Sequence, residues 1–90
     1  MNRIIIDGNL IGTREDFFEA LRRQIGEDLL CGSNLDALHD ALTALSAHTV
    51  IEIKNESHLT EFLGDYWKHV LWMFNDCLDE NENLKLEYTE

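Results

Sequence analysis

Three strand-like segments, separated by helix-like stretches, constrain the fold of this 90-residue chain more than any other feature. The first is the isoleucine run at residues 4–6, a continuous apolar pattern typical of a strand buried on both faces. Residues 49–54 (TVIEIK) alternate and are rich in β-branched side chains, which predicts a second strand. Residues 84–88 alternate apolar with charged side chains, which predicts a strand with one solvated face at a sheet edge.

Four helices are predicted between these strands. Thr13 followed by Asp16 resembles a capping box, so a helix is expected from Thr13 to about Ile25, before Gly26. A second helix is expected from residue 33 or 34 to about residue 46. The third and fourth are expected over residues 57–63 and 66–79, with a break at residues 64–65.

The order of these elements predicts their topology. Strands joined through helical connections must run parallel, and such crossovers are right-handed. The chain contains no proline and shows no low-complexity run or internal repeat, so we expect a single domain over residues 1–90. The predicted class is α/β: a small three-stranded parallel sheet packed with about four helices, in the order β-α-α-β-α-α-β.

The charge balance indicates the kind of partner. There are 18 Asp and Glu against 7 Lys and Arg, a formal net charge of −11, while 44% of residues are hydrophobic, as expected for a folded domain. Nucleic acid and anionic membranes are disfavoured because their phosphates require basic side chains. A basic protein partner is favoured instead. The alternative is that the acidity serves only solubility.

The remaining bulk features predict a cytosolic protein without cofactors. The apolar run near the N-terminus is too short for a signal peptide or a membrane span. Cys31 and Cys77 have no CxxC or metal-ligand spacing, so no disulfide is expected. We expect neither a metal nor a cofactor, and no catalytic residue is assigned.

The predicted second helix has two contrasting faces. Its leucines share one sector of a helical wheel and predict a buried face: Leu35, Leu38, Leu42 and Leu45. Asp36, Asp40 and Thr43 cluster on the opposite side, with His39 at the boundary. No Lys or Arg lies three or four residues from either aspartate on this helix, although like charges at i, i+4 cost roughly 0.2–0.5 kcal/mol.

Structural explanations compete with a binding role for these residues. Asp36 lies in the first turn, where a negative charge complements the helix dipole, but Asp40 lies in the middle of the helix. A metal or acid–base site built on Asp36, His39 and Asp40 is disfavoured because His39 is displaced from the aspartate face. Trp67 is predicted to be in the core. Trp72 projects away from the apolar stripe, and a rim position, an oligomer contact and partial burial all remain open for it.

The segment from Gly32 to Leu38 (GSNLDAL), with Asp40, Leu42 and Thr43 after it, resembles a known signature. That signature is Y-G-x-N-L-D-A-L-W-D-x-L-T of the barstar family, intracellular inhibitors of the ribonuclease barnase. The chain length, the order of elements and the spacing to the motif also fit. The resemblance implies an inhibitor that occludes a ribonuclease active site with an acidic helix and the loop before it.

The resemblance also implies roles for individual residues. Asp40 is expected to be the main mimic of an RNA phosphate, with Asp36 and Thr43 beside it and Asp76 contributing from the fourth helix. The full predicted partner-binding set is Asp36, Asp40, Thr43, His39, Asp76, Leu30, Cys31, Gly32, Asn34 and Ala44. The implied partner is a basic nuclease toxin bound one to one, with this chain as a cytoplasmic immunity protein that is monomeric when free.

Four positions depart from the family signature. Leu30 stands where the family has a tyrosine, Cys31 replaces the neighbouring aromatic residue, His39 replaces a tryptophan and Ala44 replaces a glycine. The charged centre is thus retained without its aromatic surround, and such surrounding residues often set specificity. We therefore expect a target nuclease other than barnase. The alternative is an acidic regulatory module that binds a partner other than a nuclease.

Overall fold

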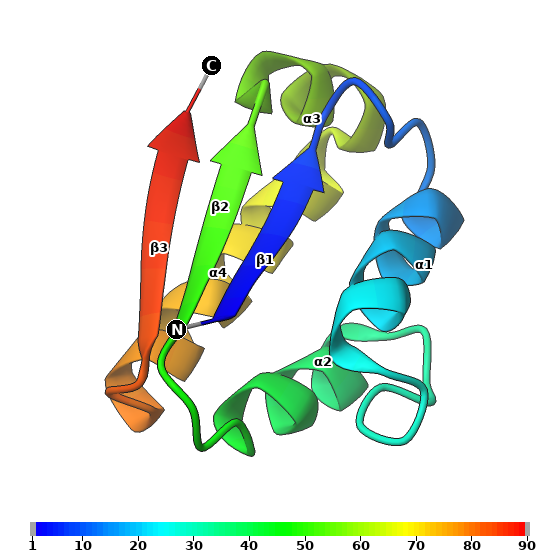
Figure 1. The fold of residues 1–90 in the computed structure, drawn as a ribbon. Coiled ribbons are helices and arrows are strands. Elements are labelled where there is room, and N and C mark those ends of the chain that lie inside the picture. Colours follow the sequence, from blue (N-terminus) through cyan, green and yellow to red (C-terminus); the bar gives the residue numbers. More distant parts are fainter. Residues whose placement is uncertain (1, 90) are drawn as a thin grey trace.

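The computed structural model describes residues 2–89 and confirms the predicted α/β class and order of elements (Figure 1). The strands are β1 (Asn2–Asp7), β2 (Thr49–Lys54) and β3 (Leu84–Thr89), and the helices are α1 (Arg14–Ile25), α2 (Leu35–Thr43), α3 (Glu56–Leu63) and α4 (Asp65–Glu80). The strands form one parallel sheet in the order β1-β2-β3, so β2 is central and β3 is an edge strand, as predicted.

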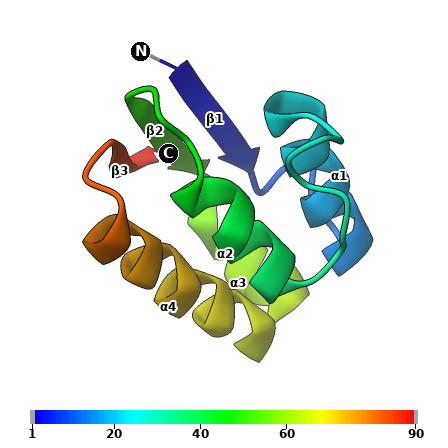
Figure 2. The same ribbon diagram turned by 90° about the horizontal axis from the view of Figure 1, so that it is seen from below.

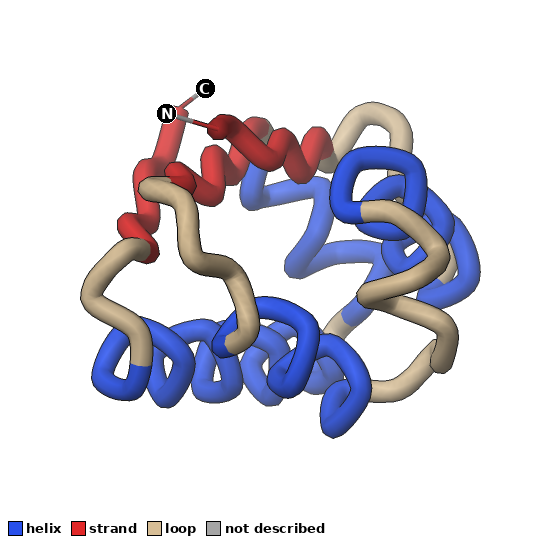
Figure 3. The backbone as a smooth tube through the Cα atoms, turned by 60° about the horizontal axis from the view of Figure 1, so that its bottom comes forward, coloured by secondary structure: helices blue, strands red, loops and turns tan. Residues whose placement is uncertain are grey.

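The hydrophobic core lies between one face of the sheet and the helices (Figures 1 and 3). Ile4 and Ile6 of β1 are buried and pair in register with Ile51 and Ile53 of β2, which are also buried. Trp67 of α4 is buried as predicted, and its indole Nε1–H donates to Glu56 at 3.0 Å. The sheet therefore supplies the apolar floor on which the helices pack.

The prediction that β1 is buried on both faces is wrong, because Ile5 is 38% exposed. β1 is an edge strand, and Ile5 alternates with the buried Ile4 and Ile6, so it points to the opposite face of the sheet. No helix of residues 2–89 crosses that face (Figure 1). The outer edge of β1 is instead paired with a side chain. The Ile5 amide donates to Gln24 Oε1 at 2.7 Å, and Gln24 Nε2 donates to the Ile5 carbonyl at 2.8 Å.

A polar network shields the middle of the open sheet face. Glu52 on β2 is 92% buried, and its carboxylate contacts Arg3 of β1 at 2.6 Å and Lys54 at 3.7 Å. The Thr89 hydroxyl of β3 donates to the same carboxylate at 3.0 Å. This donor, followed by Arg3, lowers the pKa of Glu52 below its ordinary value. Helices normally cover both faces of a parallel sheet. On this face, charged side chains take the place of the second layer of helices.

The helix boundaries differ from prediction most clearly at the end of α2. This helix ends at Thr43, three residues before the expected position, and the Leu45 amide then donates to the Leu42 carbonyl at 3.3 Å. The Asn81 side-chain amide, just after α4, donates to the carbonyls of Leu42 at 3.1 Å and Leu45 at 2.8 Å. The last turn of α2 is thus satisfied by a residue almost forty positions away in sequence.

Candidate functional site

The N-terminus of α2 is fixed by Asn34, which is the N-cap residue. Its side-chain oxygen accepts a hydrogen bond from the Ala37 amide at 2.8 Å, one of the bonds that an uncapped helix leaves unmade. Leu38 and Leu42 are fully buried below the helix. Because one face is held in the core, the opposite face of α2 is presented to solvent.

That outer face carries Asp36 and Asp40. Both residues are exposed, and the Asp40 side chain retains 89% of its accessible surface. Among the described residues, no lysine or arginine nitrogen lies within ion-pair distance of either carboxylate. The structure thus places the two charges where the sequence predicted, without an intramolecular lysine or arginine to neutralise them.

Thr43 lies near these aspartates but uses its hydroxyl proton within the helix. The Thr43 hydroxyl donates to backbone carbonyls of the preceding turn. Its Oγ1 is 2.9 Å from the His39 carbonyl oxygen and 3.2 Å from the Asp40 carbonyl oxygen. A partner would therefore meet this half-buried hydroxyl as a hydrogen-bond acceptor.

His39 connects α2 to α4, which lies beside it (Figure 2). Its Nε2 is 2.7 Å from Glu80 Oε2 on α4, and its Nδ1 is 3.8 Å from Asp40 Oδ1. Glu80 was not among the predicted site residues. The predicted fourth helix ended at residue 79, whereas α4 continues to Glu80, which therefore lies one turn after Asp76 on the same side of the helix.

Asp76 is exposed on α4, one turn before Glu80. Between them Cys77 is buried, and burial followed by the charges of Glu80 and Asp76 raises the pKa of its thiol to about 12. The Cys77 thiol faces the His39 carbonyl at 3.9 Å, so this part of α4 packs directly against α2. We call the exposed carboxylates of Asp36, Asp40, Asp76 and Glu80 the acidic surface.

The loop before α2 is held by Arg22, a second residue that the sequence analysis missed. Its Nε donates to the Leu30 carbonyl at 3.1 Å, and its Nη2 donates to the Gly32 carbonyl at 3.3 Å and to Ser33 Oγ at 2.8 Å. Sequence alone shows only a basic residue in the last turn of a helix, a common position that complements the helix dipole.

The loop residues in the predicted set have different environments. Leu30 is fully buried, so its predicted contact with a partner is corrected: its leucine side chain is in the core. Cys31 is exposed, with a free thiol. Gly32 is close-packed, because a Cβ there would lie 3.0 Å from the Ala37 Cβ. Ala44 is exposed and is the C-cap residue of α2.

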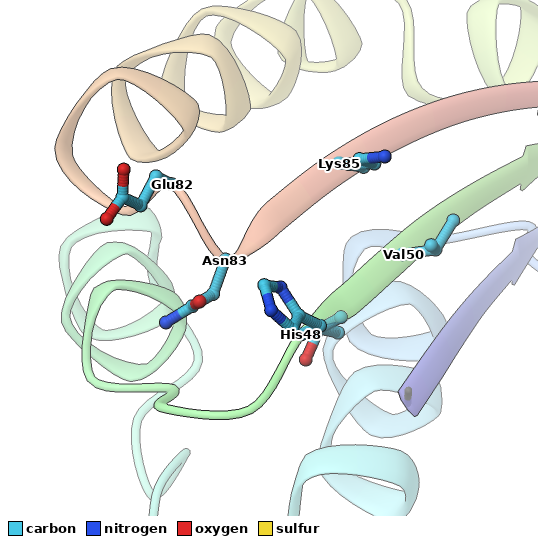
Figure 4. A pocket seen from close by; sticks show the side chains of 6 residues that line it. His48, Val50, Glu82, Asn83 and Lys85 are labelled. Carbon is cyan, nitrogen blue, oxygen red and sulfur yellow. The ribbon is translucent and has the colours of Figure 1, made fainter.

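One hollow of the described chain is a candidate small-molecule site, but its polar groups point in different directions. A pocket of about 290 Å³ lies where β2 and β3 begin, lined by His48, Thr49, Val50, Glu82, Asn83 and Lys85. Figure 4 shows the Glu82 carboxylate pointing away from His48 and Lys85, so the polar groups do not converge.

Among residues 2–89, no group of three or more His, Cys, Asp or Glu side chains could hold a metal ion. None of the helices described is both long and apolar enough to span a bilayer.

Comparison with known protein families gives a match over nearly the whole chain. The family model described as "Barstar (barnase inhibitor)" matches residues 1–89, essentially the whole chain. No curated protein matches the sequence.

Proposed function

The chain belongs to the barstar family, and from this premise we propose that it inhibits a basic ribonuclease by covering the active site with its acidic surface. The observation that carries the proposal is the exposed pair of Asp36 and Asp40, which has no lysine or arginine partner within the described part of the chain. The carboxylates would occupy the positions of RNA phosphates and meet the cations that bind them. An immunity role against a nuclease toxin in the same cytoplasm follows as part of the proposal.

The physical cost of the arrangement supports a binding role. Two carboxylates one turn apart repel each other, and only Asp36 is close enough to the helix N-terminus to gain from the dipole. A cationic active site would relieve that repulsion on binding. The formal net charge of −11 would also attract a basic partner over long range and so accelerate association.

The available area also supports a one-to-one complex. A standard interface uses about 800 Å² per partner, whereas the accessible surface of the chain is 5370 Å². α4 and the loop held by Arg22 both lie next to α2 (Figure 2), so the three segments together would supply the interface.

The test is an inhibition assay against small basic microbial ribonucleases, with barnase included in the panel. We expect at least one enzyme to lose activity stoichiometrically as the chain is added, with inhibition that RNA substrate relieves competitively. The D36N/D40N double variant should inhibit far less than E61Q, which removes one carboxylate from the exposed side of α3. Retention of full enzyme activity throughout the panel, or a complex that still cleaves RNA, would contradict the proposal.

A further inference from the structure

Trp72 on α4 is a large aromatic residue placed unusually far into solvent. It is 65% exposed, whereas the other tryptophan, Trp67, is 2% exposed. The His69 ring lies 5.4 Å from the Trp72 ring at 85°, in an edge-to-face contact that orients the two rings. Tryptophan is among the residues that most often dominate the binding energy of protein interfaces. The side chains around Trp72 therefore indicate which kind of partner group the ring could bind.

The position of Trp72 extends the acidic surface. Trp72, Asp76 and Glu80 follow one another at four-residue intervals and therefore form one row along α4. Glu80 is the last residue of that row and contacts His39 of α2 at 2.7 Å. The aromatic ring thus lies one helical turn beyond Asp76, with Cβ atoms expected about 5–6 Å apart.

Among residues 2–89, no lysine or arginine is stacked on the Trp72 ring. Among the described residues, the cation stacked on an aromatic ring is Arg14, which lies 4.0 Å from the centroid of Tyr66. Lys68, one turn before Trp72, has its ammonium nitrogen 3.8 Å from the Asp65 carboxylate. An indole face next to an unneutralised carboxylate suits an arginine, because a guanidinium can stack on the ring and bond to the carboxylate together.

We propose that Trp72 adds an aromatic contact beside Asp76, which the family resemblance already assigns to the partner-binding set, and that an arginine side chain of the basic partner stacks on the Trp72 ring. This inference rests on the proposed function, and it adds a specificity-determining contact on α4. The aromatic contact with the partner would come from Trp72 on α4. The loop before α2 has no aromatic residue at the two positions where the family signature has one, because Leu30, which is buried, and Cys31 stand there.

The first experiment uses a ribonuclease that the wild-type chain inhibits. We expect W72A to raise the inhibition constant at least about tenfold and W72F about threefold or less, since phenylalanine retains a ring. F62A is the matched control, because Phe62 on α3 is 56% exposed and should change inhibition by less than about twofold. Circular dichroism and the Tm verify folding of each variant. A W72A effect as small as that of F62A would overturn the proposal.

A second experiment separates this inference from the proposed function. Labelled octa-arginine and octa-lysine peptides are titrated with each variant and followed by fluorescence anisotropy. We expect the wild type and F62A to prefer the arginine peptide and W72A to lose that preference, even if no ribonuclease is inhibited. The assignment would be overturned if W72A preferred octa-arginine over octa-lysine as strongly as the wild type does. It would also be overturned if the wild type formed a dimer that the W72A substitution abolishes.

Discussion

Two asparagines hold the helix that presents Asp36 and Asp40. Asn34 caps the first turn of α2, and Asn81 donates to carbonyls at its last turn. Asn34 was predictable, because asparagine before an apolar helical pattern is a common N-cap. Asn81 was not, because its bonds cross from the end of α4 to α2 and depend on tertiary packing.

Replacing Asn81 with Ala should lower the free energy of unfolding by about 1–3 kcal/mol, because buried carbonyls of α2 lose their donor. Urea unfolding measures the change. The matched control is N75A at an exposed position of α4, for which we expect no loss beyond about 0.5 kcal/mol. Equal effects of the two variants would contradict a capping role for Asn81.

The two cysteines should differ sharply in reactivity. Burial raises the pKa of the Cys77 thiol to about 12, so its thiolate is scarce at pH 8, whereas Cys31 is exposed. Ellman's reagent should modify one thiol in the native protein and two in guanidinium chloride. Rapid modification of both thiols without denaturant would show that α4 is not packed against α2 in this way.

At the scale of elements, the pattern of apolar residues predicted the strands and helices, and the structure confirms their order. The exposure of Ile5 could not be predicted, because three consecutive isoleucines fit a two-sided strand and sequence does not say which strand is at the edge. The family signature predicted a binding role for the outer face of α2. It could not reveal Arg22 or Glu80, which act through contacts between elements.

The polar network on the open sheet face predicts acid sensitivity. Hydrogen bonds from Thr89 and Arg3 lower the pKa of Glu52, and those from Asn55 and Asn9 lower the pKa of Asp7. Both values lie below those of the unfolded chain, so their stabilisation is complete above about pH 4–5 and is lost as the pH falls through the folded-state values.

Urea unfolding at pH 7 and pH 3 measures this contribution. E52Q should lose less stability on acidification than the wild type, because it has no carboxylate to protonate at that position. E61Q, which removes an exposed carboxylate of α3, is the control and should retain the pH dependence of the wild type. An E52Q variant with unchanged pH dependence would contradict the role given to the Glu52 network.

At the scale of the whole molecule, the fold separates the hydrophobic core from the proposed binding surface. The core lies between the sheet and the helices, while the residues of the acidic surface are exposed on α2 and α4, two helices that lie side by side (Figure 2). Substitutions at Asp36 and Asp40 should therefore weaken binding with little loss of stability. The formal net charge of −11 adds long-range attraction to a basic enzyme, so association should slow as salt is added.

The most direct test of the central claim is the affinity of D40N for a ribonuclease that the wild-type chain inhibits, measured by calorimetry beside E61Q. Both variants remove one negative charge, so they differ in the position of the lost carboxylate. We expect Kd to rise at least about tenfold, or about 1.4 kcal/mol, for D40N and to change by less than about twofold for E61Q. A folded D40N variant that binds within about twofold of the wild type would contradict the claim that Asp40 stands in for an RNA phosphate.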